Sequence, residues 1–176
     1  MKKMLGDERR QYLFELLKQA DGPLKGTELA KLTNVSRQVI VNDMNLLKAR
    51  NEPIMATSQG YIYMPATPAH TAVERKIVCL HDATQTKEEL YAIVDCGVTV
   101  KNVSVEHSVY GEITASMMVS NRLEVDDFLA RVTATQSSLL SSLTDGTYVH
   151  VLTAPTAQQI DMALANLRAL GILVEG

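Results

Sequence analysis

The 176-residue chain has room for two small domains or one of medium size, and its 46% of apolar residues excludes a disordered protein. Its longest apolar runs are far shorter than the ~20 residues of a membrane-spanning helix. Its first seven residues lack the apolar stretch of a secretory signal. Cys79 and Cys96 follow no disulfide or metal-binding spacing. We therefore expect a cytoplasmic protein with reduced thiols and no membrane partner.

The net charge of −3 is unevenly distributed along the chain. Residues 1–64 carry 10 Lys and Arg against 7 Asp and Glu, a net charge of +3. Residues 65–176 carry 7 against 13, a net charge of −6. This division is typical of a DNA-binding head joined to an acidic regulatory part. Because the positive excess of the head is small, a single copy would bind DNA weakly, and we expect a homodimer with twice the phosphate contacts.

Three helices are predicted in the head. The first extends over residues 7–20 and is ended by the Asp-Gly-Pro sequence at residues 21–23. A short helix over residues 26–33 is followed by Asn34, which suits a tight turn because Asn tolerates left-handed backbone. A third helix extends over residues 36–48. A short helix, a tight turn and a second, capped helix are typical of a helix-turn-helix.

The helix over residues 36–48 has two faces. Ser36 can cap its start, since a serine oxygen accepts hydrogen bonds from amides two or three residues further on. Apolar residues recur at helical spacing on the inner face: Ile40, Met44 and Leu47. The opposite face is polar, lacks a carboxylate and carries Arg37, Gln38 and Asn42. Because Arg, Gln and Asn form paired hydrogen bonds with purine edges in the major groove, this face predicts a recognition helix.

Two short β-prone runs follow on either side of the Ser58-Gln59-Gly60 turn and predict a hairpin, or wing. Together with the helices, this order resembles the winged-helix domain of biotin-repressor-like bacterial regulators. Four segments carry the resemblance: residues 26–30, 35–40, 43–47 and 60–61. It implies that double-stranded operator DNA is contacted by the recognition helix and the wing. We expect these contacts from Ser36, Arg37, Gln38, Asn42, Lys48, Gln59 and Tyr61.

Two prolines within residues 65–71 predict an extended linker between a winged helix-turn-helix domain at residues 1–64 and a regulatory domain at residues 72–176. The elements predicted for the second domain are strands at 73–80, 98–105, 112–119, 148–153 and 172–174 and helices at 84–95, 123–136 and 156–170. This order favours an α+β protein whose second domain is an open-faced sandwich, with one antiparallel-rich sheet and helices on one face. The order of the strands in the sheet stays open.

Histidines and a carboxylate lie at the ends of elements in the second domain. His81 closes the first predicted strand of this domain, and Glu89 lies eight residues further on, within the next helix. Tyr148 and His150 alternate along one strand and therefore point to the same face. Imidazole and carboxylate together suit zinc, nickel, iron or manganese. Spacing alone does not distinguish such a site from structural histidines.

Three segments of the second domain are similar to the three-histidine domain that follows a winged helix in niacin-responsive repressors of NAD biosynthesis and niacin uptake: residues 81–90, 107–111 and 148–155. The resemblance implies a domain whose topology is similar to that of the phosphocarrier histidine protein. It also implies nicotinic acid as corepressor and a divalent transition metal, zinc or nickel, in the second domain.

Carried over residue by residue, the resemblance places metal ligands at His81, Glu89 and His150, and Tyr148 stands where the family has the first histidine of a His-x-His pair. The expected metal site therefore comprises His81, Glu89, Tyr148 and His150. A water, the bound ligand or His107 could supply the fourth ligand, with Tyr148 lining the pocket instead. The residues expected to bind the corepressor are His107, Ser108, Tyr110 and Tyr148.

These features together predict a transcriptional repressor that binds operator DNA as a homodimer with nicotinic acid as corepressor. Two alternatives remain open. One is a metal-sensing regulator, in which the ion itself is the signal. The other, less favoured, is a small metal-dependent hydrolase fused to a DNA-binding head, since a site of two histidines and a glutamate can activate water. Against an enzyme, the second domain has no glycine-rich phosphate loop and no separate nucleophile.

Overall fold

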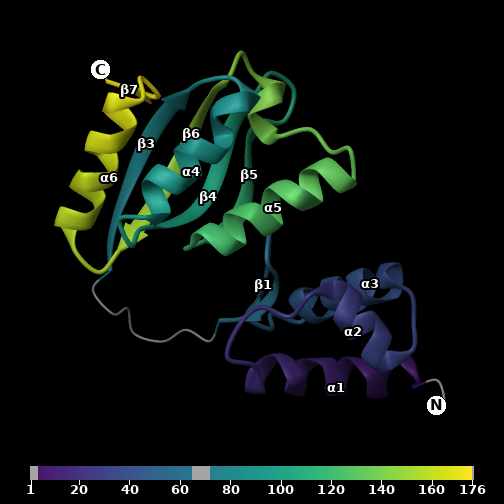
Figure 1. Ribbon diagram of the computed structural model, residues 1–176. Helices are drawn as coiled ribbons and strands as arrows, with labels where there is room; N and C mark the ends of the chain where they lie inside the picture. Colours follow the sequence, from purple (N-terminus) through teal and green to yellow (C-terminus); the bar gives the residue numbers. More distant parts are fainter. Residues whose placement is uncertain (1–3, 65–71, 176) are drawn as a thin grey trace. The chain divides into compact units, whose positions relative to one another are not determined.

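The computed structural model describes residues 4–64 and 72–175, which form two compact units (Figure 1). The boundary between the units falls after Pro68. It therefore lies inside the predicted linker at residues 65–71, which itself lies outside the described residues. None of the helices in the described ranges combines the length and the apolar character needed to cross a membrane.

The first unit is a three-helix domain with a hairpin. Its elements are α1 (Gly6–Gln19), α2 (Gly26–Thr33), α3 (Arg37–Ala49), β1 (Ile54–Thr57) and β2 (Gly60–Tyr63). Its core is formed by side chains spaced three or four residues apart on the helices: Leu13, Leu17, Leu29, Ile40, Met44 and Leu47. The three predicted helices and the wing are therefore present, in the predicted order.

Local signals fix the turns of this unit. Asn34 adopts left-handed backbone with φ of 51°, and the Ser36 side chain accepts a hydrogen bond from the Val39 amide at 3.4 Å, as its capping role requires. The second strand of the wing begins at Gly60, where φ is 134° and an added Cβ would lie 2.4 Å from the Leu24 carbonyl oxygen. A glycine is needed there because Leu24 and Tyr61 exchange backbone hydrogen bonds and bring the two chains together.

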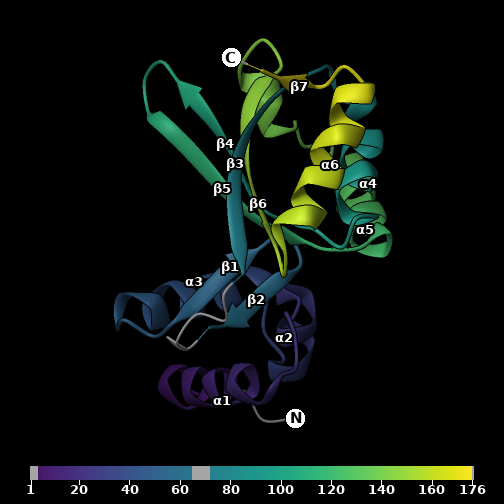
Figure 2. The same cartoon turned by 90° about the vertical axis from the view of Figure 1, so that its left-hand side faces the viewer.

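The second unit is one antiparallel sheet covered by helices on one face. Its elements are β3 (Val73–Leu80), α4 (Thr86–Val94), β4 (Thr99–His107), β5 (Gly111–Val119), α5 (Arg122–Ala134), β6 (Thr147–Ala154), α6 (Ala157–Ala169) and β7 (Leu173–Val174), with short 3-10 helices η1 (Ala83–Gln85) and η2 (Leu140–Leu143). The strand order is β5-β4-β6-β3-β7, and all neighbours are antiparallel. Figure 2 shows α4, α5 and α6 on the same side of the sheet. The predicted open-faced α+β sandwich is confirmed.

Alternation along the central strands places polar side chains in the core of this unit. On β6, residues Tyr148, His150 and Leu152 are buried, and the intervening residues point to the opposite face. The register pairs Cys79 with Tyr148 and Ile77 with His150, so the inner face of β3 continues this layer. Two titratable side chains therefore face the helices from the middle of the sheet.

Candidate functional site

Glu89 is the centre of a buried polar cluster. It lies on α4, its side chain faces the sheet, and the residue is only 1% exposed. His81 Nε2 lies 3.0 Å from Glu89 Oε2, and the Tyr148 hydroxyl donates to the same oxygen at 2.5 Å. The Tyr148 hydroxyl also forms a hydrogen bond with His81 Nε2. On the other carboxylate oxygen, Oε1, the nearest group is His150 Nε2 at 3.6 Å. The cluster therefore joins strand β6, the loop after β3 and helix α4 through one carboxylate.

Both histidines are oriented through their Nδ1 atoms. His81 Nδ1 lies 2.6 Å from the carbonyl oxygen of Asp82, and His150 Nδ1 lies 2.7 Å from that of Asn102. Since a carbonyl oxygen only accepts, each Nδ1 carries a hydrogen, and each Nε2 points toward Glu89. Asn102 can reach His150 because the pairing of β4 shifts register at this point, an irregularity of the β-bulge type.

The electrostatics of the cluster favour an ionised Glu89 and a neutral Tyr148. Burial by itself raises the pKa of the Glu89 carboxyl, but the nearby imidazoles of His150 and His81 outweigh burial and hold this pKa well below its usual range. For His81, burial lowers the pKa, and the hydrogen bonds to Glu89 and to the Asp82 carbonyl raise it by more. Burial and the negative charge of Glu89 both raise the pKa of Tyr148 far above its ordinary value.

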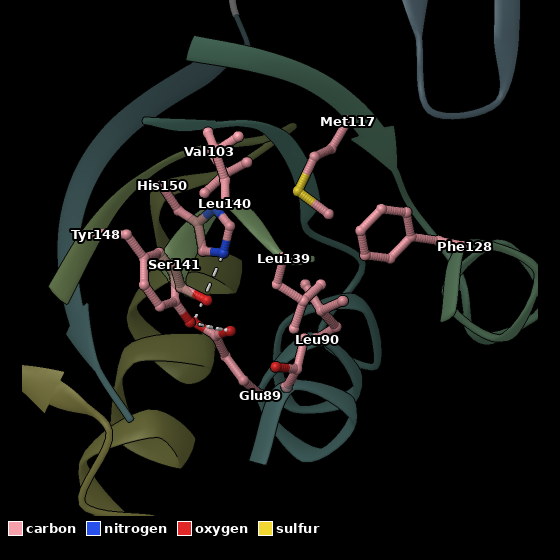
Figure 3. A pocket seen from close by; sticks show the side chains of 11 residues that line it. Glu89, Leu90, Val103, Met117, Phe128, Leu139, Leu140, Ser141, Tyr148 and His150 are labelled. Atoms are coloured by element: carbon pink, nitrogen blue, oxygen red, sulfur yellow. Dashed lines mark hydrogen bonds and ion pairs between the residues drawn. The ribbon is translucent and has the colours of Figure 1, made fainter. Parts of the chain in front are cut away.

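A pocket with apolar walls opens beside this cluster. Its walls come from α4, β4, β5, α5 and the η2 segment, and Figure 3 shows Glu89, Tyr148 and His150 grouped to one side with Met117 and Phe128 on the other. The space open to the centre of a water-sized sphere is about 40 Å³. One water needs ~10–15 Å³ by this measure, so the pocket has room for about three waters. A small ligand that combines an apolar body with polar groups suits this lining.

Two polar atoms at this pocket lack hydrogen-bond partners. Among the described residues, Thr86 Oγ1 and Glu89 Oε1 are buried side-chain atoms without a partner, and both residues line the pocket. Leaving a buried polar group unpaired costs ~1–3 kcal/mol, more for a charged group, so such atoms are rare in folded proteins. An unpaired carboxylate oxygen and an unpaired hydroxyl at one cavity indicate a binding site for a polar ligand.

The residues of the cluster do not fit a transition-metal centre, and this prediction is not supported. Within residues 4–64 and 72–175, no group of three or more His, Cys, Asp or Glu side chains is arranged to hold a metal ion. His81 and His150 approach different oxygens of Glu89, and the Tyr148 hydroxyl already bonds both His81 Nε2 and Glu89 Oε2. Only Glu89 Oε1 and His150 Nε2 remain open, whereas zinc sites use three or four protein ligands.

The expected corepressor contacts from His107, Ser108 and Tyr110 are also not supported. These residues form the exposed turn between β4 and β5, where His107 Nδ1 accepts from the amides of Val109 and Tyr110. His107 lies four residues beyond Val103, the pairing partner of His150, which corresponds to about 13 Å along a strand. Of the four expected ligand-binding residues, only Tyr148 lines the pocket.

Most of the pocket lining was not predicted. The missed residues come from five segments that meet only in the folded domain: Thr86, Leu90, Val103, Met117, Phe128, Leu139, Leu140 and Ser141. The helical spacing of Phe128 with Val125 and Leu129 is typical of a core residue and does not distinguish it from a residue that lines a pocket. The two leucines before Ser141 could have indicated that this half-buried segment packs against the domain. Nothing local marks Thr86, the first residue of α4, as part of the pocket lining.

The recognition helix presents the predicted polar face. Arg37, Gln38 and Asn42 are exposed, and the Gln38 side-chain amide donates to Asn42 Oδ1 at 3.3 Å. The Lys48 ammonium lies 5.8 Å from the centre of the Tyr61 ring, so helix and wing meet here. The predicted DNA contact from Gln59 does not fit the structure, because this residue is buried and its side-chain amide donates to Ser58 Oγ. The residues predicted to contact DNA thus include an exposed face of α3, with Lys48 and Tyr61 beside it.

A buried ion pair holds the recognition helix against α1. Asp43 on α3 is 2% exposed and accepts hydrogen bonds from Arg9 Nε at 2.6 Å and Arg9 Nη2 at 3.2 Å. Arg10 Nη1 adds a third hydrogen bond at 3.2 Å. A bidentate pair of this kind fixes both the position and the rotation of a helix. The orientation of the Arg37 face therefore depends on two arginines of α1.

Comparison with known proteins extends these observations to the whole chain. Residues 9–62 match the family profile of the HTH domain, and residues 74–176 match that of the 3H domain. The chain is 52% identical over 174 residues to the transcription repressor NadR of Bacillus subtilis (strain 168), covering 98% of this chain and 97% of the relative. It is 32% identical over 173 residues to the probable transcription repressor NiaR of Thermotoga maritima, with the same coverage.

Proposed function

Since the chain belongs to the family of NAD- and niacin-responsive transcription repressors that join an HTH domain to a 3H domain, we propose that it represses genes of NAD biosynthesis and niacin uptake with nicotinic acid as corepressor. The chain is a DNA-binding repressor rather than an enzyme, because both relatives are named transcription repressors. We place it in the cytoplasm, with its DNA. A hydrolase fused to a DNA-binding head is therefore not proposed. A metal-sensing regulator is not proposed either, because the cluster does not fit a metal site.

Operator DNA is read by the exposed face of α3. Arg37, Gln38 and Asn42 enter the major groove, where such side chains bond purine edges. Ser36 lies at the N-terminus of the same helix, where amides attract a phosphate. Lys48 and Tyr61 contact the DNA backbone beside the groove. The net charge of +3 on residues 1–64 supports this assignment and limits the affinity of one head.

Two copies therefore bind the operator together. The face of the sheet opposite the helices supports a contact between second domains, because it carries exposed apolar side chains on adjacent strands. Val78 and Leu80 on β3 point away from the helices, and Val174 on β7 is the cross-strand partner of Val78. Leu80 is 47% exposed. A closed two-fold dimer built on this face would present two heads to a near-palindromic operator.

Nicotinic acid binds in the pocket beside Glu89. The observation that carries this proposal is the pair of unpartnered buried atoms, Thr86 Oγ1 and Glu89 Oε1, at a cavity with apolar walls. The aromatic ring packs between Met117 and Phe128. The ring nitrogen, once protonated, donates to Glu89 Oε1, and the carboxylate accepts from the hydroxyls of Thr86 and Ser141. Nicotinamide has no carboxylate and should bind more weakly.

The corepressor acts by binding one state of the dimer more tightly than the other. A ligand shifts such an equilibrium only by its differential affinity for the two states. Typical coupling free energies of ~1–3 kcal/mol change the affinity of the second site by about 5–150-fold. The pocket is bounded by α4, α5 and η2, so a ligand there can change how these helices pack against the sheet and where the connected heads lie.

A titration of operator DNA tests this function. Fluorescence anisotropy of a labelled operator fragment is measured with full-length protein alone, with nicotinic acid and with nicotinamide. We expect nicotinic acid to tighten operator binding by about 5–150-fold and nicotinamide to have a much smaller effect. Arg37→Ala should weaken operator binding with and without nicotinic acid. An operator affinity that does not respond to nicotinic acid in the wild-type protein would overturn the proposed corepressor.

A further inference from the structure

We propose that this chain binds its small-molecule effector without a metal ion, because the Tyr148 hydroxyl bonds both His81 Nε2 and Glu89 Oε2, two of the atoms that would have to hold an ion. The absence of a metal from the cluster is inferred from the hydrogen bonds of its own side chains, whereas the binding of the effector there rests on the proposed function. The position concerned is the one at which the family pattern has the first histidine of a His-x-His pair.

The hydrogen bonds of the cluster use up the groups that would hold an ion. His81 places Nδ1 against the Asp82 carbonyl and Nε2 against Glu89 Oε2, so both ring nitrogens face acceptor oxygens. A nitrogen that donates a hydrogen bond has no lone pair left for a metal. The Tyr148 hydroxyl bonds the same Nε2 and the same Oε2. His81 Nε2, Glu89 Oε2 and the Tyr148 hydroxyl therefore satisfy one another, and within the described residues only Glu89 Oε1 of this group is left without a hydrogen-bond partner.

The buried charge of Glu89 is already compensated. An isolated carboxylate costs far more to bury than a neutral group unless it is paired and hydrogen-bonded. Glu89 meets His81 and Tyr148 through Oε2, and His150 Nε2 lies 3.6 Å from Oε1. The edge-to-face packing of the Tyr148 ring against both imidazoles, with centroids 5.4 Å and 5.0 Å away, keeps the two histidines apart. No divalent cation is needed to hold the carboxylate in the core.

The shape of the tyrosine explains why it excludes the ion. A phenol reaches further from its strand than an imidazole, and here it reaches from β6 across to Glu89 on α4. An imidazole at the same position would end nearer the strand and offer a third ring nitrogen facing Glu89. Three histidine nitrogens with one carboxylate are a typical set for zinc or nickel. The Tyr148→His variant is therefore the matched test for gain of a metal site.

The measurement is the metal content of untagged full-length protein. Wild type, Tyr148→His and Tyr12→His are incubated with Zn²⁺ or Ni²⁺, dialysed, and analysed for metal per chain by mass spectrometry. Tyr12→His adds a histidine on the surface of α1, outside the cluster, and controls for non-specific binding. We expect wild type and Tyr12→His to retain less than about a tenth of an ion per chain, and Tyr148→His to retain about one.

Binding of the effector without metal is tested by repeating the titration of operator DNA with nicotinic acid in the presence and absence of a chelator. If nicotinic acid tightens operator binding, chelator should leave the wild-type response unchanged. Wild-type protein that retains about one ion per chain after dialysis would overturn the proposal, whatever nicotinic acid does. So would a nicotinic acid response that chelator abolishes. If the wild-type protein retains no metal and operator binding does not respond to nicotinic acid, the conclusion that the cluster is metal-free stands and the proposed corepressor is refuted. Should Tyr148→His fail to fold, the wild-type metal content still decides.

Discussion

The ion pair between Asp43 and Arg9 is the most direct link between the stability of the head and its reading of DNA. Replacing Asp43 with Ala removes the three hydrogen bonds that Arg9 and Arg10 donate to its carboxylate. Arg9 is only 8% exposed, so its guanidinium would remain buried without the carboxylate that pairs with it. Breaking a buried pair by removing one partner typically costs about 3–5 kcal/mol. The whole stability of a small domain is only ~5–15 kcal/mol.

The expected result is a large loss of stability in the head alone. For a domain of 60–100 residues, 1 kcal/mol corresponds to about 4–8 °C, so a loss of 3 kcal/mol lowers the melting temperature by at least ~12 °C. Thermal unfolding of the full chain, followed by far-UV circular dichroism, should show this shift in the transition of the head and leave that of the second domain in place. Operator affinity should fall in parallel.

A double variant separates the ion pair from the space it fills. Asp43→Leu combined with Arg9→Met replaces both charges with apolar side chains of similar length, and such exchanges are often neutral or stabilising. We therefore expect the double variant to recover most of the stability lost in Asp43→Ala. A loss below about 1 kcal/mol in Asp43→Ala, or no recovery in the double variant, would refute the idea that this pair anchors the recognition helix.

Four further outcomes are expected. Thr86→Val removes a buried hydroxyl without a partner, so calorimetry should show unchanged or higher stability, while nicotinic acid affinity falls by about 2–12-fold. Arg37→Ala should cost roughly 1–3 kcal/mol of binding to the operator but less to unrelated DNA, as measured by anisotropy. Leu80→Glu should shift the protein toward monomer in sedimentation. The melting temperature of the second domain should be highest at mildly acidic pH and fall on both sides. Folding lowers the pKa of Glu89, so the stability that its charge provides is lost as the pH falls below 4.5, the ordinary pKa of a glutamate. Folding raises the pKa of His81, so the stability that its protonated form provides is lost as the pH rises above 6.5, the ordinary pKa of a histidine.

The sequence by itself determined the order of the elements and the turns of the head. Ser36 and Asn34 act through contacts with residues at most four positions away, so their roles follow from local patterns. Strand β3 begins and ends at the predicted residues because the β-prone character of a run is a local property of the sequence. His81 and Glu89 were placed together by the resemblance to the three-histidine domain, since their spacing alone did not distinguish a site from structural residues.

Only the tertiary structure decided how those residues are used. The Tyr148 hydroxyl meets residues 59 and 67 positions away, and this contact replaces the expected metal ligand with a hydrogen bond. His107 belongs to the same strand as Val103 but lies at its exposed end, which no local pattern distinguishes. Gln59 is buried although it lies in a turn, and Phe128 lines the pocket although its spacing is that of a core residue. In each case the outcome depends on register and helix packing between distant segments, which periodicity does not encode.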